Sequence, residues 1–221
     1  MRDEHHSRPH DVGPQRRTFL GRLAAATAAL GLAPWTSHAA TLDAHHEAGQ
    51  ATEPWMKRLT GANRVVFHAH EPTGGLALRW AQTFLDTQKS SYGRVDSDSS
   101  VVVGLNGKSV GLLFNDAIWA KYPIGQTLAL PGVVNPLGPS GSNIVSQLLA
   151  RGVIILACQN SLRAAGQRFL PEPARADAAA RTAFGAEVAA NLLPGVETVP
   201  AMVVTLQMAQ ERGCRYVYAG G

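Results

Sequence analysis

The chain is poor in cysteine, in charged residues and in aromatic residues, and these shortages limit what it can be. Of its 221 residues, 2 are cysteine, 16% are charged and 6% are aromatic, whereas 45% are hydrophobic. A hydrophobic content of this size is typical of a globular protein and excludes an intrinsically disordered chain. The length is sufficient for one domain with its own core.

Several motifs that identify enzyme or partner classes are also missing. We find no phosphate-binding P-loop, no dinucleotide fingerprint, no Gly-x-Ser-x-Gly elbow and no carboxylate pair at a distinctive spacing. The formal net charge is +4, and residues 1–39 carry five of the arginines against three acidic residues. The remainder has no cluster of Lys and Arg, so nucleic acid is not a predicted partner.

The first 39 residues have the features of an export signal. The features are the paired arginines Arg16-Arg17, an apolar run from Leu20 to about Ala33, and the small-x-small site Ser37-His38-Ala39. This order resembles a twin-arginine signal peptide and predicts cleavage near Ala39 and a periplasmic location. The apolar run is shorter than the roughly 20 residues of a membrane-spanning helix, so no stable membrane anchor is expected.

After the leader, apolar patterning predicts alternating strands and helices. Residues 40–62 are predicted to be a flexible lead-in with a short helix around Trp55, and residues 63–221 one domain. The predicted strands are 65–70, 101–105, 153–157, 196–199 and 215–218, and the main helices are 76–89, 116–121, 143–150, 174–190 and 201–212. This alternation predicts a three-layer α/β fold with a doubly wound, mostly parallel, five-stranded sheet in the flavodoxin-like order.

The two cysteines are predicted not to pair. Cys158 lies at the carboxyl end of its predicted strand, whereas Cys214 lies at the amino-terminal start of another. In a parallel sheet these are opposite edges, about four residues apart at roughly 3.3 Å each. A disulfide requires Cα atoms within about 7 Å, so Cys158 is expected to be a free thiol. Cys214 is interpreted as a packing residue.

Cys158 is the first candidate for chemistry because ligands gather at the carboxyl ends of parallel strands. A helix over Asn160 to Ala165 would bring backbone N–H groups to the sulfur and activate it. The alternative is that Cys158 is a small buried apolar residue.

His68 and His70 are a second candidate, because residues two apart on a strand share a face. In the flavodoxin-like order the first and third strands are neighbours, so His70 would approach Cys158 and activate it, or contribute with Glu71 to a metal site. The alternative is a strand-end histidine bonded to the backbone. No set of three metal ligands stands at a strong spacing, so no metal ion and no cofactor is predicted.

Several segments of the chain, taken in order, resemble the DsrE/DsrF-like sulfur-relay family over roughly residues 64–219. The matching segments are Val101 to Gly107, Asn115 to Tyr122, Gly152 to Cys158, Leu193 to Pro200, and Gln210 to Tyr218. Family members often carry His-Gly after the second strand, where this chain has Asn106-Gly107.

The resemblance implies a three-layer α/β domain that assembles into trimers or hexamers. Several family members pass sulfur between partner proteins as a cysteine persulfide, and Cys158 matches a cysteine that recurs in the family. It implies Cys158 as the persulfide carrier, with a sulfur donor or acceptor protein as partner. His70, Asn106, Asn115 and Asp116 are the candidate binding residues.

Two other functions remain open on the sequence alone. In the first alternative, the chain is a non-catalytic oligomeric module that holds a small ligand or metal in the irregular stretch 122–141, since long loops in compact domains are often functional. Alternatively, it is a structural subunit that travels with a redox enzyme.

Overall fold

The structure is a computed structural model that describes residues 53–220. The predicted signal peptide, its cleavage site near Ala39 and the first part of the lead-in lie outside the described residues. Within the described part of the chain, no helix is both long and apolar enough to cross a membrane.

Five strands alternate with helices, as the apolar pattern predicts. The strands are β1 (Asn63–Ala69), β2 (Ser99–Leu105), β3 (Ile154–Cys158), β4 (Glu197–Val199) and β5 (Arg215–Tyr218). The helices are α3 (Leu76–Tyr92), α4 (Asp116–Lys121), α5 (Ile124–Thr127), α6 (Ile144–Ala150), α7 (Gln159–Arg163), α8 (Gly166–Phe169), α9 (Ala178–Ala190) and α10 (Met202–Glu211). Short 3-10 helices cover Pro54–Arg58, Thr73–Gly75, Asp96–Asp98 and Ser109–Leu113.

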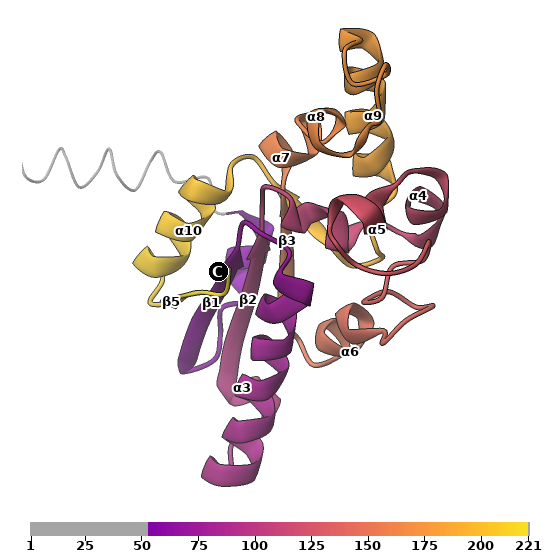
Figure 1. The fold of residues 1–221 in the computed structure, drawn as a ribbon. Helices are drawn as coiled ribbons and strands as arrows, with labels where there is room; N and C mark the ends of the chain where they lie inside the picture. The colour runs from indigo at the N-terminus through magenta and orange to yellow at the C-terminus, as the bar shows by residue number, and fades with distance from the viewer. Residues whose placement is uncertain (1–52, 221) are drawn as a thin grey trace, which may run out of the picture. The chain divides into compact units, whose positions relative to one another are not determined.

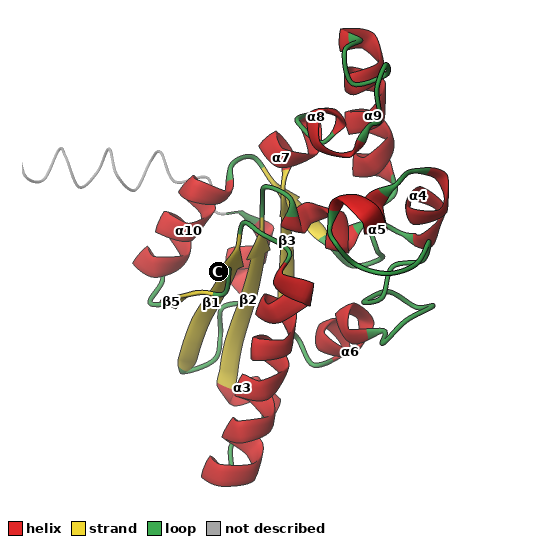
Figure 2. Cartoon of the chain, in the orientation of Figure 1, coloured by secondary structure: helices red, strands yellow, loops and turns green. Residues whose placement is uncertain are grey.

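The strands form one parallel sheet in the order β4-β3-β2-β1-β5, with helices on both faces (Figures 1 and 2). The predicted three-layer α/β fold with a five-stranded parallel sheet is therefore confirmed. The predicted pairing of the first and third strands is wrong: β1 and β3 are not neighbours, because β2 lies between them. Apolar alternation marks where strands begin and end, but it carries no information on which strands pair.

Alternate residues of the central strands β1, β2 and β3 face two separate cores. In β1, Val65 and Phe67 belong to the larger core on the α3 side of the sheet, whereas Val66 belongs to the smaller core on the α10 side. Figure 1 shows α3 and α10 on opposite sides of the sheet. Burial on both faces explains why β2 and β3 are almost continuously apolar in sequence.

The end of the predicted flexible lead-in belongs to the fold. Trp55 is 1% exposed and packs with Met56 and Leu59 in the core on the α10 side. Gly61 lies so close to β2 that an added Cβ would stand 2.5 Å from the carbonyl carbon of Ser99. The prediction of a flexible segment is therefore wrong for residues 53–62, because three large apolar side chains lose their contact with water there.

Arg151, at the end of α6, ties two acidic residues to the helix. Its guanidinium donates to both carboxylate oxygens of Asp96, at 2.8 and 2.9 Å, and to Asp86 at 2.6 Å. The hydrogen bonds from Arg151 hold the pKa of Asp96 below its usual value of 3.8. A carboxyl whose pKa is lowered by folding stabilises the folded state above its unfolded pKa, and this contribution is lost as the pH falls through the folded value.

We therefore expect Asp96→Asn to lower the free energy of unfolding at pH 7 by at most about 1 kcal/mol, since the pair is partly exposed and screened. Urea unfolding of the variant and the wild type at several pH values measures this difference. The difference should begin to shrink near pH 4, where the unfolded carboxyl binds a proton, and should be lost as the pH falls through the lower pKa of the folded carboxyl. An equal difference at pH 7 and at the lowest pH would contradict the assignment.

Candidate functional site

The order of the strands points to one position on the carboxyl edge of the sheet. From β1 the chain steps to β2, β3 and β4 in one direction, and then α10 carries it back to place β5 on the other side of β1. Ligands of open α/β sheets bind at such a switch in strand order, outside the carboxyl ends of the strands. Here the switch lies between β1 and β5, where His68 pairs with Tyr218.

His68 lies at this switch and uses both of its ring nitrogens. Its Nε2 is 3.0 Å from Oδ1 of Asn106, and its Nδ1 is 2.9 Å from the hydroxyl of Tyr216. Partial burial lowers the pKa of His68; the bond to Asn106 opposes this effect and the charge of His70 adds to it. In the neutral ring, Nε2–H donates to the amide oxygen and Nδ1 accepts the phenol proton.

His70, which directly follows β1, approaches the same amide oxygen of Asn106. Its Nδ1 is 3.2 Å from Oδ1 of Asn106, so two imidazoles share one acceptor. The His70 ring packs over Gly107, whose φ is +58°, and an added Cβ would stand 2.5 Å from a ring carbon. Only glycine satisfies both the positive φ and the close approach of the ring. Asn106-Gly107 is thus a turn built around His70.

We call His68, His70, Asn106 and Tyr216 the switch-point cluster. The structure brings together two of the predicted binding residues, His70 and Asn106, and adds His68 from the same face of β1. Sequence reasoning missed Tyr216, although its alternation with Tyr218 in the last strand places both phenols on one face. Burial raises the pKa of Tyr216, with a smaller contribution from Tyr218, so the phenol stays protonated at neutral pH.

The open side of the cluster is aromatic. The rings of Tyr216 and Tyr218 lie 5.9 and 5.6 Å from the ring of His68, and the two tyrosines are 43% and 47% exposed. On the other side, Glu71 lies between His70, at 4.0 Å, and Lys108, at 3.6 Å. The cluster is therefore accessible to solvent and flanked by one ion pair.

Cys158 is the last residue of β3. Its side chain lies on the same face of the sheet as the switch-point cluster but is buried. It is 4% exposed, and its Sγ accepts a hydrogen bond of 3.4 Å from the backbone N–H of Met202. The thioether of Met202 lies against Gly104 on β2, where an added Cβ would stand 2.6 Å from its sulfur. The first turn of α10 thus lies over the thiol. A donor from the helix that follows Cys158 was predicted, and this is wrong: the donor comes from α10.

The predicted contact between His70 and Cys158 is also wrong, because β2 separates their strands. Asn106 stands between them instead. It follows Leu105, which pairs with Ala157, and so lies level with Cys158 on the neighbouring strand. The next amide, of Gly107, donates to the hydroxyl of Ser161 at 2.9 Å, which ties the turn to the helix after Cys158.

Both cysteines are free, as predicted. Cys214 precedes β5, which is separated from β3 by β1 and β2. At about 4.8 Å per strand the lateral distance alone is roughly 14 Å, twice the reach of a disulfide. Burial raises the pKa of the Cys214 thiol, so this sulfur is a poor nucleophile at neutral pH.

Asn115 and Asp116, the other predicted binding residues, are engaged in structural contacts. Asn115 caps α4 by accepting the N–H of Ile118 at 3.1 Å. Asp116 accepts the backbone N–H of Asn135 at 2.9 Å and also the hydroxyl of Ser140. No hydrogen bond or ion pair joins them to His70 or Asn106 in the described part of the chain, so the structure does not bring these four residues together.

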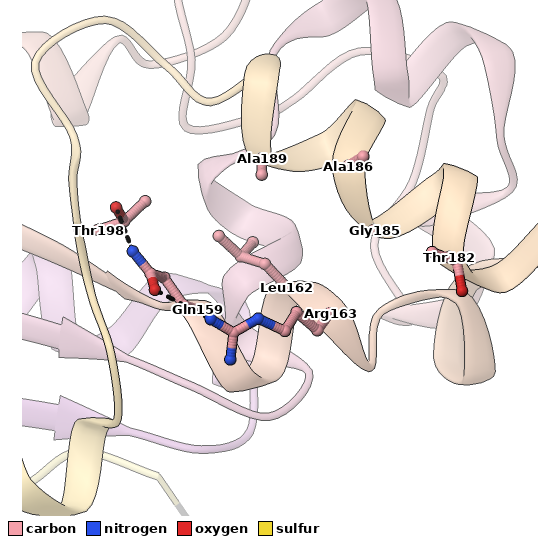
Figure 3. A pocket seen from close by; sticks show the side chains of 8 residues that line it. All are labelled: Gln159, Leu162, Arg163, Thr182, Gly185, Ala186, Ala189 and Thr198. Carbon is pink, nitrogen blue, oxygen red and sulfur yellow. Dashed lines mark hydrogen bonds between the residues drawn. The ribbon is translucent and has the colours of Figure 1, made fainter.

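A separate pocket of about 530 Å³ opens between α7, α9 and the end of β4 (Figure 3). Its lining is formed by Gln159, Leu162, Arg163, Thr182, Gly185, Ala186, Ala189 and Thr198. The small residues of α9 leave the space empty. Gln159 donates to Thr198 at 3.1 Å and accepts from Arg163 at 3.2 Å, so these three polar side chains bond to one another. Such a pocket suits a small, partly apolar ligand.

Within residues 53–220, no three side chains of His, Cys, Asp and Glu gather in a group that would hold a metal ion. The imidazoles of His68 and His70 are joined only by the amide of Asn106.

Comparisons with known proteins do not assign this chain to a family. No protein-family model matches it, and no curated protein does. Among solved structures, the chain is similar to a protein of unknown function, MTH1491 from Methanobacterium thermoautotrophicum. The two share 20% sequence identity over 71% of this chain and 98% of the other, with a TM-score of 0.42.

Proposed function

We propose that this protein is an exported sulfur-handling protein in which Cys158 accepts sulfane sulfur and passes it on. The observation that carries the proposal is a free thiol at the carboxyl end of β3 with a backbone N–H of α10 directed at its sulfur. An N–H donor interacts more strongly with a thiolate or persulfide anion than with a neutral thiol. The resemblance to the DsrE/DsrF-like family supports the same residue.

The chemistry requires two nucleophilic exchanges. The thiolate of Cys158 attacks a terminal sulfur of a polysulfide, a new S–S bond forms, and the S–S bond inside the donor breaks. The donor leaves as a polysulfide anion shorter by one sulfur. An acceptor thiolate then attacks the outer sulfur of the persulfide and releases the Cys158 thiolate, so no external oxidant or reductant is needed.

In this proposal the first turn of α10 must open, because Cys158 is only 4% exposed. No side chain caps the amino terminus of α10, and Val203 and Val204 in its first turn are 72% and 51% exposed. A helix end without a side-chain cap opens at a lower free energy than the core, and this opening must release the buried side chain of Met202. We further propose periplasmic location by the twin-arginine pathway and assembly into a trimer or hexamer, with a sulfur donor or acceptor protein as partner.

Incubation with polysulfide tests the proposal. The purified protein is expected to gain about 32 Da per sulfur on the peptide that contains Cys158, and the gain should disappear after treatment with a reducing thiol. Cys214→Ala is the matched control and should gain the same mass. The sulfur-carrier proposal fails if the wild type gains no sulfur or if Cys158→Ala gains as much.

The pocket in Figure 3 supports a second candidate function, a non-catalytic module that binds a small ligand between α7 and α9. The same experiment separates the two. A protein that takes up no sulfur but retains a small molecule in its native mass spectrum would favour the ligand-binding module.

A further inference from the structure

The imidazoles of the switch-point cluster converge on one point. His68 Nε2 and His70 Nδ1 lie 3.0 and 3.2 Å from the same Asn106 oxygen. The two nitrogens are therefore at most about 6 Å apart, which follows from these two distances. Imidazole nitrogens are the commonest ligands of metal ions in proteins.

The opposite nitrogen of each ring also has a partner. His68 Nδ1 is 2.9 Å from the Tyr216 hydroxyl, and His70 Nε2 is 4.0 Å from a Glu71 carboxylate oxygen. Metal-binding histidines almost always direct their second nitrogen at an oxygen of this kind, which sets the ring orientation and the tautomer. Each imidazole thus has an inward nitrogen toward Asn106 and an outward nitrogen toward an orienting oxygen.

The backbone under the cluster is held in place by the sheet and its turns. The N–H of Ala219 donates to the carbonyl of His68 at 2.7 Å, and the N–H of Ser109 donates to the carbonyl of His70 at 3.1 Å. The N–H of Asn106 donates to Ala69 at 3.1 Å. The side chain of His70 is 52% exposed, so an ion can reach the cluster from solvent.

We infer that the switch-point cluster binds a divalent transition-metal ion through His68 Nε2, His70 Nδ1 and the amide oxygen of Asn106, with water at the remaining positions. Two imidazoles and one neutral oxygen suit Cu²⁺, Ni²⁺ or Zn²⁺, with Cu²⁺ bound most tightly. The set lacks the carboxylates that Ca²⁺ and Mg²⁺ require. Metal binding at Nε2 moves the ring proton of His68 to Nδ1, where the Tyr216 hydroxyl accepts it, and the Glu71 carboxylate faces Nε2 of His70 at 4.0 Å. Tyr216 and Glu71 are therefore positioning residues.

The test is a titration of the full chain with Cu²⁺ and, separately, Zn²⁺, followed by calorimetry and native mass spectrometry. We expect one ion per chain and at least a ~10-fold loss of affinity in His70→Ala, because a ligand should matter no less than the outer-shell partners whose loss costs about 10- to 100-fold. Tyr216→Phe should weaken binding less, and the nitrogen hyperfine splitting in the Cu²⁺ electron paramagnetic resonance spectrum should change. Half of the His70 side chain is exposed, so His70→Ala should remain folded at the temperature of the titration, which thermal unfolding checks.

The chain also contains histidines before residue 53, and these supply the control. His45→Ala/His46→Ala is expected to bind the metal as the wild type does. The inference is overturned if this double variant loses the ion, or if His70→Ala binds with unchanged affinity. Neither readout depends on sulfur uptake by Cys158, so this test and that of the sulfur-carrier proposal fail separately.

Discussion

Replacement of Met202 by alanine is expected to raise the rate at which an alkylating reagent modifies Cys158 by about tenfold or more. Met202 covers the thiol with its backbone and fills the space over Gly104 with its thioether. Removal of a buried methionine side chain costs about 2–5 kcal/mol, and a tenfold change in an opening equilibrium requires only about 1.4 kcal/mol. Part of the lost packing energy is thus enough to expose the sulfur more often.

The rate is measured by mass spectrometry of the modified Cys158 peptide under native conditions. Met208→Ala is the control, because Met208 packs against the same core but makes no contact with Cys158 through its backbone amide. Cys214 provides an internal comparison, since its labelling should be slow in all variants. Equal rates of Cys158 labelling in Met202→Ala and the wild type would mean that the reagent does not enter through the first turn of α10.

Asn135→Leu is expected to reduce the free energy of unfolding by about 3 kcal/mol or more. Asn135 is fully buried, and its Nδ2 donates to the carbonyls of Leu112 and Phe114, both at 2.8 Å. Its Oδ1 accepts the N–H of Leu137 at 2.9 Å. Leucine has a similar volume but leaves three buried backbone groups unpaired, and each costs about 1–3 kcal/mol.

Urea denaturation followed by circular dichroism measures this loss. Ser142→Ala, directly after the same stretch, is the control: Ser142 is exposed and makes a single side-chain bond, to Pro136 at 3.1 Å, so a change below about 0.5 kcal/mol is expected. A change of the same size in Asn135→Leu would show that the irregular stretch 122–141 is not anchored to the core. Anchoring by Asn135 gives this stretch a structural role beside the ligand-holding role that its length suggests.

Much of the fold follows from local patterns in the sequence. The apolar run of residues 153–157 predicts a strand buried on both faces, and β3 is buried along its whole length. The prediction of helix 116–121 agrees with α4 residue for residue. These elements are predictable because hydrophobic periodicity and capping residues act within one or two turns of the chain.

The candidate site was predictable only in part. Histidines two apart on a strand must share a face, so the proximity of His68 and His70 follows from the pleat alone. The partners of these histidines do not follow, because Asn106 comes directly after β2 and Tyr216 lies in β5, and no local pattern records the order of the strands. The wrong expectation of a contact between His70 and Cys158 has the same origin.

The sequence by itself determined which segments become strands and helices, that the sheet is parallel and covered on both faces, and that Cys158 and Cys214 lie at opposite edges. Only the tertiary structure decided that β2 separates β1 from β3, that α10 covers Cys158, and that two imidazoles meet at Asn106. The reason is physical. Periodicity and caps are properties of neighbouring residues, whereas strand order and burial result from packing between segments that are far apart in the chain.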